Sequence, residues 1–187
     1  MLLALTHLLA KGQRPYYIQS MSSDMTWQMS STGSADTEHL GALLGKQLKG
    51  GEIIELRSDL GGGKTTFVRG LARGAGSKDA VTSPTFTLNK IYRAKNDLQI
   101  HHFDFYRLDQ TGLIADQLSE SLSSPKSIVV IEWSDIIKNV LPGDYLSIEF
   151  LPMQNNPEER TINFNYPESY RRIITAVETS WKEIRPW

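Results

Sequence analysis

Apolar residues recur along most of this chain at the two spacings that distinguish helices from strands. They return every three to four positions between residues 34 and 48 and between residues 170 and 181, which is typical of amphipathic helices. Shorter helices are predicted at residues 64–73 and 111–122. Apolar runs or strict alternation predict strands at residues 53–56, 85–92, 98–104, 127–131, 146–150 and 162–166. Helices and strands interspersed over 187 residues predict one domain of the α/β class.

The first 33 residues do not follow these patterns. Residues 1–10 are almost entirely apolar, but no basic residue precedes them, as a secretory signal would require. The next stretch has several serines and no acidic residue before Asp24, which faintly resembles an organelle transit peptide. We favour a poorly ordered extension. The chain is therefore divided into an N-terminal extension, residues 1–33, and a single α/β domain, residues 34–187.

Composition and charge exclude several classes of function. The chain has 20 Lys and Arg against 21 Asp and Glu, so overall charge does not favour a protein held on nucleic acid by bulk electrostatics. It has no cysteine, which excludes disulfide scaffolds, thiolate zinc sites and thiol catalysis. No apolar run reaches about 18 residues, the length of a membrane-spanning helix. A cytoplasmic protein without membrane contact is expected.

The most informative segment is residues 58–65, SDLGGGKT, between a predicted strand and a predicted helix. A phosphate loop reads G-x-x-x-x-G-K-[ST] in that context. Its glycines let backbone N–H groups surround a phosphate, and the helix N-terminus adds a positive dipole end. Lys64 would reach the β- and γ-phosphates, and the Thr65 hydroxyl would bind Mg²⁺. Ser58 stands in place of the first glycine, so we expect it to strain the loop or open it slightly.

Two acidic residues follow predicted strands. Asp104 ends the strand at residues 98–104, and Glu132 follows the apolar strand at residues 127–131. Ligands of open α/β sheets bind at the carboxyl ends of the strands. Either acid could hold Mg²⁺, directly or through water, or orient the attacking water, and the sequence does not assign these roles between them. The alternative is a strand-end acid that faces solvent.

Hydroxyl groups and histidines supply weaker signals. Ser83 and Thr85 lie in the segment VTSPTF, which could sense a γ-phosphate as nucleotide switch loops do, or could be a simple turn. His101 and His102 are adjacent on a predicted strand, so their side chains point to opposite faces and cannot share one metal. One packed and one exposed histidine is expected.

Four segments follow one another along the chain: GGGKTTFVRGLARG, VTSPTFTL, HHFDFYRLD and VVIEWSD. In their order and spacing they resemble the bacterial TsaE family, and the resemblance covers residues 37–149. The resemblance implies a P-loop NTPase-like three-layer sandwich, with a mostly parallel central sheet and antiparallel additions. It implies a weak, partner-dependent ATPase that uses ATP and Mg²⁺ in tRNA threonylcarbamoyladenosine synthesis. The implied partners are TsaD and TsaB, and tRNA is reached only through their complex. The transfer to adenosine 37 belongs to TsaD.

The resemblance also assigns residues by position. Thr65 and Glu132 match Mg²⁺ ligands, Asp104 a functionally important acid, Trp133 an aromatic beside the site, and Thr37 a threonine near the base. The predicted catalytic residues are Lys64, Asp104 and Glu132, and the predicted metal ligands are Thr65, Asp104 and Glu132. The predicted nucleotide-binding residues are Thr37, Asp59, Leu60, Gly61, Gly62, Gly63, Lys64, Thr65, Thr66, Ser83, Thr85 and Trp133. Two positions depart from the family, which usually has glycine where Ser58 stands and commonly has alanine where Gly62 stands.

Three other functions compete with this one. A small P-loop kinase usually needs an arginine-bearing lid, and the chain has no arginine cluster outside the helix with Arg69 and Arg73, which we expect to form a solvated basic face. A regulatory GTPase would carry Asn-Lys-x-Asp, and the nearest string, residues 89–92, lacks the aspartate. A nucleotide-binding scaffold that does not hydrolyse remains an alternative because of Ser58.

Overall fold

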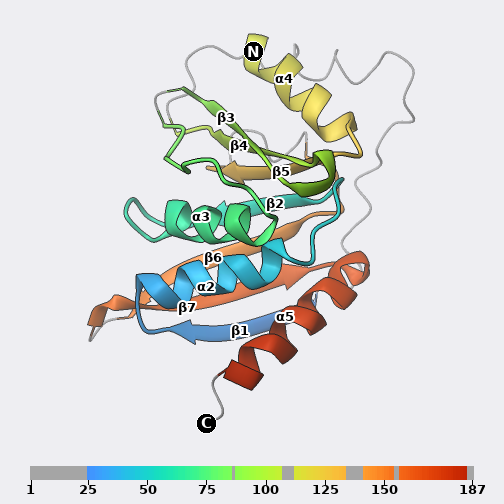
Figure 1. The fold of residues 1–187 in the computed structure, drawn as a ribbon. Helices are drawn as coiled ribbons and strands as arrows, with labels where there is room; N and C mark the ends of the chain where they lie inside the picture. The colour runs from blue at the N-terminus through green and yellow to red at the C-terminus, as the bar shows by residue number, and fades with distance from the viewer. Residues whose placement is uncertain (1–24, 86, 107–111, 134–140, 154–155, 185–187) are drawn as a thin grey trace.

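The computed structural model describes residues 25–85, 87–106, 112–133, 141–153 and 156–184 as one seven-stranded sheet with helices packed on it (Figure 1). The strands are β1 (Met25–Ser31), β2 (Ile53–Arg57), β3 (Asn89–Arg93), β4 (Gln99–Asp104), β5 (Ser127–Glu132), β6 (Leu146–Met153) and β7 (Asn156–Tyr166). The helices are α2 (Ser34–Gly45), α3 (Lys64–Gly74), α4 (Gly112–Ser123) and α5 (Arg171–Ile184), with short 3₁₀ turns η1 (Lys95–Asp97) and η3 (Glu168–Tyr170).

The strand order is β1-β7-β6-β2-β5-β4-β3, with a parallel centre and antiparallel edges. Strands β6, β2, β5 and β4 run in the same direction, whereas β3 on one side and β7 and β1 on the other are antiparallel to their neighbours. The carboxyl ends of the four central strands therefore meet at one edge of the sheet. This topology confirms the predicted fold class.

Helices cover both faces of the sheet. Helices α2, α3 and α5 pack on one face, where their apolar side chains join those of the strands in a single core cluster. On the opposite face α4 places Ile114 and Leu118 against Phe103, Val129 and Ile131 of β4 and β5. All six residues of β5 are buried, as expected for a strand covered on both faces. Each large apolar side chain buried in this way stabilises the fold by about 1.5–3 kcal/mol.

Helices α2 and α3 lie side by side (Figure 1), closer together than ordinary side chains would allow. A Cβ atom at Gly70 would lie 1.8 Å from the carbonyl oxygen of Glu38, and one at Gly45 would lie 2.0 Å from that of Leu71. The two helices thus contact each other through their backbones around residues 70 and 71 of α3. No local sequence pattern predicts this role of the glycines, because it depends on how the two helices pack.

The predicted boundary after residue 33 is wrong, because β1 belongs to the sheet. It pairs with β7 over its full length, with Met25 opposite Tyr166. Met29 is buried, and the ring of Trp27 lies 4.8 Å from that of Phe164. The alternation of apolar and polar residues in MTWQMSS is a strand signal that its polar composition obscured. The rest of the predicted extension, residues 1–24, lies outside the described residues.

The remaining predicted elements are all present, with differences at their ends: α2 ends at Gly45 instead of residue 48, and β7 begins at Asn156 instead of residue 162. The strand expected at residues 85–92 begins only at Asn89. Before it the chain turns, since the amides of Thr87 and Leu88 both donate to the carbonyl of Pro84. Phe86 lies outside the described residues. No helix in the described ranges is long and apolar enough to cross a membrane.

Candidate functional site

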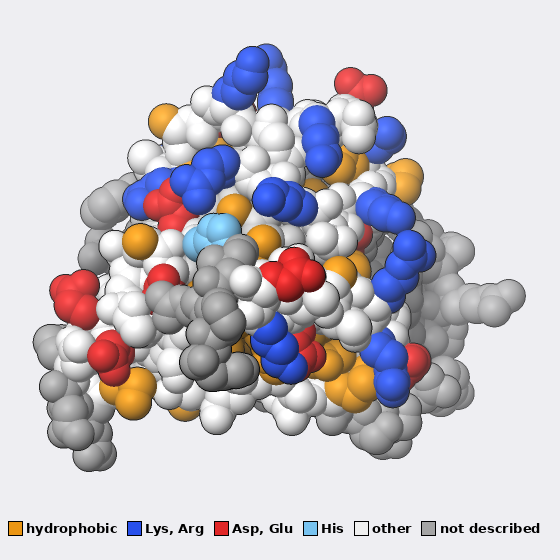
Figure 2. Space-filling model, turned by 60° about the horizontal axis from the view of Figure 1, so that its bottom comes forward, with side chains coloured by type: hydrophobic (Ala, Val, Ile, Leu, Met, Phe, Trp, Pro, Cys, Tyr) orange, Lys and Arg blue, Asp and Glu red, His pale blue; other side chains and the backbone are white. Residues whose placement is uncertain are grey.

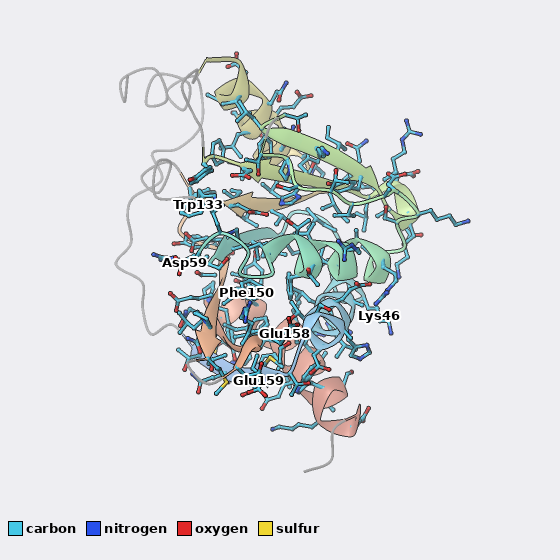
Figure 3. All side chains as sticks on the ribbon, turned by 90° about the vertical axis from the view of Figure 1, so that its left-hand side faces the viewer. Lys46, Asp59, Trp133, Phe150, Glu158 and Glu159 are labelled. Atoms are coloured by element: carbon cyan, nitrogen blue, oxygen red, sulfur yellow. The ribbon has the colours of Figure 1, made fainter. Side chains whose placement is uncertain are left out.

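Most of the predicted site residues line one cavity of about 210 Å³ at the carboxyl edge of the sheet. Its lining consists of Leu60, Gly61, Gly62, Gly63, Lys64, Thr65, Thr66, Ser83, Thr85, Asp104, Glu132 and Trp133. Figure 3 shows Trp133 and Asp59 at this edge, with Lys46, which follows α2, at the opposite end of the molecule. Thr37 and Asp59 are the two predicted residues that do not line this cavity.

The loop between β2 and α3 has the backbone of an anion-binding turn. Gly61 and Gly63 adopt left-handed conformations, with φ of 77° and 104°, which strongly favour glycine. Gly63 is also the N-cap of α3 and makes no side-chain cap hydrogen bond. The first N–H groups of a helix have no partner within the helix, so those of α3 are available to an anion in the cavity.

Lys64 is buried, with 6% of the residue exposed, and its ammonium group contacts the loop. Its Nζ atom donates to Ser58 Oγ at 2.9 Å, to the Ser58 carbonyl at 3.2 Å and to the Asp59 carbonyl at 3.3 Å. It also lies 3.8 Å from Glu132 Oε2 and 5.0 Å from the centre of the Trp133 ring. The lysine therefore connects the phosphate loop to the end of β5.

Ser58 does not have the strained backbone expected of it. The described non-glycine residues with positive φ are Leu88, Asn96, Asp97 and Trp133. Ser58 is not among them, so its position does not require glycine on conformational grounds. Its hydroxyl donates to the Asp59 carbonyl at 2.9 Å and accepts from Lys64, which closes the loop rather than opening it.

Asp104 and Glu132 are direct partners in the register of β4 and β5, and both are buried. Glu132 Oε1 lies 2.8 Å from His102 Nε2, in addition to the contact of Oε2 with Lys64. Asp104 accepts from the Thr85 hydroxyl at 2.6 Å and from the amide of Tyr106 at 3.0 Å. The alternative of solvent-facing acids is therefore wrong for both residues.

The hydroxyl-rich segment is tied to Asp104. Ser83 Oγ and Thr85 Oγ1 lie 2.7 Å apart, and Thr85 Oγ1 in turn donates to Asp104 Oδ2. Pro84 between them is buried. A group that displaced either hydroxyl would thus act on the carboxylate at the end of β4.

Both histidines of β4 are buried, so the expected exposed histidine is wrong. His101 lies on the α4 side, where Nδ1 is 2.7 Å from Ser121 Oγ, and burial lowers the pKa of its ring. His102 lies on the other face and is fully buried. An ionised Glu132 would only accept hydrogen bonds, so His102 Nε2 would be the donor in this pair. The Nδ1 atom of His102 is buried without a partner among the described residues.

Trp133 adopts a left-handed backbone with φ of 59°, which is rare for a bulky residue. Its ring packs against Tyr106 at 4.9 Å and against the ammonium group of Lys64. Strain of this kind costs about 1–3 kcal/mol and concentrates at functional sites. The conformation is consistent with a functional role for Trp133.

Thr37 lies behind the loop, not in the cavity. Its hydroxyl lies 2.7 Å from Ser31 Oγ and donates to the Gly33 carbonyl at 3.2 Å, while its methyl group faces Gly63. Arg160 of β7 donates from Nε to the Gly62 carbonyl at 3.3 Å, which brings a cation to the loop. No local pattern points to Arg160, because 98 positions separate it from Gly62 in the chain.

The oxygen atoms at the cavity fit a magnesium ion better than a transition metal. Mg²⁺ is usually bound by one or two carboxylates together with water and substrate phosphates. Thr65, Asp104 and Glu132 supply a hydroxyl and two carboxylates. In the part of the chain that the structure describes, no three His, Cys, Asp or Glu residues form a metal-binding group. The donor set therefore suits a metal that completes its shell with phosphate and water.

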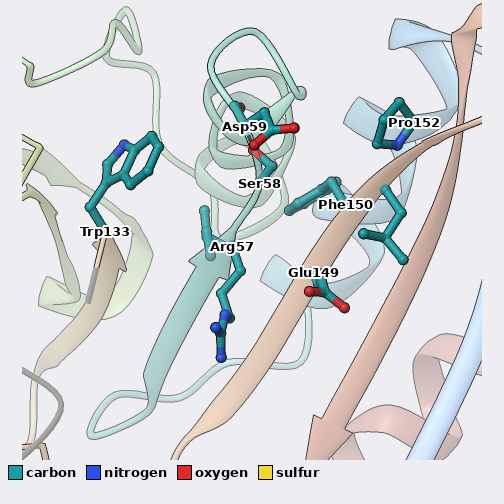
Figure 4. A pocket seen from close by; sticks show the side chains of 9 residues that line it. Arg57, Ser58, Asp59, Trp133, Glu149, Phe150 and Pro152 are labelled. Atoms are coloured by element: carbon teal, nitrogen blue, oxygen red, sulfur yellow. Dashed lines mark hydrogen bonds between the residues drawn. The ribbon is translucent and has the colours of Figure 1, made fainter. Parts of the chain in front are cut away.

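A second cavity of about 220 Å³ adjoins the first and shares Trp133 with it. Figure 4 shows Ser58 and Asp59 at the end of β2, Glu149, Phe150 and Pro152 along β6, and Trp133 across from them. Asp59, the remaining predicted residue, lines this cavity.

A family model described as "Threonylcarbamoyl adenosine biosynthesis protein TsaE" matches residues 31–162. The chain belongs to the TsaE family. It is 38% identical over 143 residues to the TsaE protein of Streptomyces coelicolor, covering 76% of this chain and 91% of that protein. It is 33% identical over 132 residues to TsaE of Treponema pallidum, covering 71% and 96%.

A solved structure has a similar fold. The crystal structure of Bacillus subtilis YdiB superimposes with a TM-score of 0.69 at 25% identity, covering 85% of this chain and 98% of that one. Membership of the TsaE family supports a role in the biosynthesis of threonylcarbamoyladenosine in tRNA.

Proposed function

We propose that the protein binds Mg-ATP in the phosphate-loop cavity and hydrolyses it slowly, in support of threonylcarbamoyl transfer to tRNA adenosine 37 by a TsaD–TsaB complex. The observation that carries the proposal is the meeting of the phosphate loop, Lys64 and two buried carboxylates, Asp104 and Glu132, at one cavity. Fold alone would not argue for this activity, since one fold supports many functions.

Binding would rest on the loop and its lysine. The backbone N–H groups of residues 61–65 would surround the phosphates, and Lys64 would exchange contacts with the loop for phosphate oxygens. Arg160 lies against the Gly62 carbonyl, so a second cation stands close to the bound anion. Thr65, with one or both carboxylates, would hold the metal, which when bound neutralises charge on the phosphates.

Hydrolysis would rest on position and charge, because phosphoryl transfer needs little covalent chemistry from the protein. Both oxygens of Asp104 accept hydrogen bonds from Thr85 and Tyr106. Glu132 has His102 on one oxygen and the more distant Lys64 on the other. We therefore assign metal binding or water orientation at this edge to Glu132 first, and the link to the Ser83–Thr85 segment to Asp104.

Dependence on partner proteins is supported by the surface around the site. The described part of the chain exposes five large hydrophobic residues, and four of them lie around this edge of the sheet: Leu60, Tyr106, Leu151 and Met153. Leu60 is 65% exposed at the tip of the phosphate loop. Apolar side chains exposed at the edge that carries the cavity supply surface that a partner protein could bury. TsaD and TsaB are the proposed partners at this edge.

Contact with tRNA would pass through the partners. Figure 2 shows Lys and Arg side chains spread over one face of the molecule with Asp and Glu among them. The pair that the sequence placed on a basic face, Arg69 and Arg73, is neutralised in part by Glu38, at 3.6 Å and 2.5 Å. A cytoplasmic location follows from the proposed pathway.

The test is ATP hydrolysis by the purified protein with and without TsaD and TsaB. We expect slow hydrolysis that the partners stimulate and that Lys64→Ala abolishes. Hydrolysis that ignores the partners would contradict the pathway. Transfer of phosphate to a small acceptor would indicate a kinase. Binding of ATP without hydrolysis in either mixture would indicate a scaffold.

A further inference from the structure

Ser58 and Gly62 lie against each other in the loop between β2 and α3. A Cβ atom at Gly62 would lie 2.5 Å from Ser58 Oγ and 2.6 Å from Ser58 Cβ, distances that real Cβ atoms essentially never show. Gly62 does not have a positive φ, unlike Gly61 and Gly63. What requires glycine at residue 62 is therefore the side chain of Ser58.

The side chain of Ser58 also accepts a hydrogen bond from Lys64. An ammonium group has three protons, and three loop oxygens lie within 3.3 Å of Nζ. Two are backbone carbonyls, which any sequence supplies, and the third and nearest is the Ser58 hydroxyl. Since that hydroxyl donates its proton to the Asp59 carbonyl, its lone pairs remain for the lysine. Figure 4 shows Ser58 at the end of β2, where the loop begins.

We propose that Ser58 is a positioning residue, which holds Lys64 against the loop and so weakens nucleotide binding. The side chain of Ser58 in turn requires glycine at position 62. The first part rests on the proposed function, because it assumes that phosphate oxygens compete for Lys64. A phosphate that takes up the ammonium group must replace at least one of the three loop contacts. In a chain with glycine at position 58, only the two carbonyls would compete.

Two variants separate the hydroxyl from the volume of the side chain. Ser58→Ala removes the hydroxyl and keeps Cβ, whereas Ser58→Gly removes both. We expect both variants to bind Mg-ATP about tenfold more tightly in calorimetric titration, which is the strength of one hydrogen bond to a charged group. In the Lys64→Met background, Ser58→Ala should leave the affinity unchanged. A purely structural role of Ser58 would give the same change with and without the lysine.

The pairing with Gly62 is tested without nucleotide, by thermal unfolding of the full chain. Gly62→Ala should lower Tm by about 5 °C in the wild-type and Ser58→Ala backgrounds, because Cβ of residue 58 remains in the way. In the Ser58→Gly background the nearest remaining atom is the Asp59 carbonyl oxygen at 3.0 Å. In that background Gly62→Ala should lower Tm by less than about 2 °C, because a small shift of the loop is enough to make room for the new Cβ atom.

The outcomes separate this inference from the function on which it rests. If the wild-type chain does not bind Mg-ATP, the proposed function fails and the positioning role fails with it. If the wild type binds but Ser58→Ala binds equally or more weakly, only the positioning role is overturned. An equal loss of Tm from Gly62→Ala in all three backgrounds would overturn the pairing.

Discussion

Strands β4 and β5 end beside each other in acidic residues, and the surroundings of these two ends differ. Asp104 faces neutral donors, the hydroxyl of Thr85 and the amide of Tyr106. Glu132 faces the ring of His102 and, at 3.8 Å, the ammonium group of Lys64. Both side chains are about equally buried, so exposure does not distinguish them.

The difference indicates two tasks at one edge. Glu132 is connected to the phosphate loop through Lys64, so its charge acts where a nucleotide would lie. Asp104 is connected to the segment with Ser83, so it is suited to holding that segment in place. Equivalent places in a sheet therefore do not give equivalent chemistry, because each acid takes its role from the side chains that face it.

Of the residues at these two strand ends, Glu132 should have the largest effect, tested by Glu132→Gln, which keeps the size of the side chain and removes its charge. Hydrolysis should fall about 100-fold or more, the usual contribution of a positioned acid or base. Folding should suffer much less, since glutamine can still accept from His102. The measurement is the ATPase rate per folded molecule at saturating Mg²⁺, and an unchanged rate would remove Glu132 from the mechanism.

Asp104→Asn should reduce hydrolysis less, by about 30-fold. Asparagine keeps an oxygen for the Tyr106 amide but presents an NH₂ group or a weaker acceptor to Thr85. The same ATPase assay measures the effect, with Mg²⁺ titrated in both variants. A loss equal to that of Glu132→Gln, with the same rise in the Mg²⁺ requirement, would show that the two acids share one task.

His102→Leu should reduce hydrolysis about tenfold, because Glu132 loses the hydrogen bond that orients it. His102→Gln keeps a donor and should recover part of the rate. The Mg²⁺ concentration for half-maximal activity should rise in the leucine variant and return toward wild type in the glutamine variant. If both variants lose activity only in proportion to their lower folded fraction, His102 is structural.

Thr85→Val removes one hydroxyl from the Asp104 end and should reduce hydrolysis about threefold, with a smaller effect from Ser83→Ala. The valine fills the same volume, so unfolding measurements should change little. Steady-state kinetics on both variants test the order of these effects. A larger loss from Ser83→Ala would mean that Ser83 acts on the nucleotide and not through Thr85.

The smallest effect on activity is expected from His101, the control for His102 on the opposite face of β4. Burial lowers the pKa of His101, so the unfolded chain binds its proton at a higher pH than the folded chain. Above about pH 6.5, the pKa of histidine in the unfolded chain, His101 does not lower the free energy of unfolding. As the pH falls below that value, the unfolded chain binds the proton more readily and the free energy of unfolding decreases. His101→Gln should flatten that pH dependence in urea unfolding and leave hydrolysis at pH 7 unchanged. A steep loss of activity would contradict the separation of the two faces.

Much of the fold is readable from local pattern. Helix α5, which contains Trp181, is set by periodicity, and strand β5 by a continuous apolar run. The strand–loop–helix around Lys64 is equally local, because glycines and a helix start fix its shape. The strand at residues 25–31 was missed because its apolar residues are few and its stability comes from pairing with β7.

The sequence by itself determined which residue types could bind phosphate and metal, since the phosphate loop and the strand-end acids are features of neighbouring residues. Only the tertiary structure decided their partners. His102 meets Glu132 across 30 positions and Arg160 meets Gly62 across 98, contacts that depend on strand order and register. Local spacing specifies elements, whereas the field around a charged group is set by side chains that the fold brings from elsewhere.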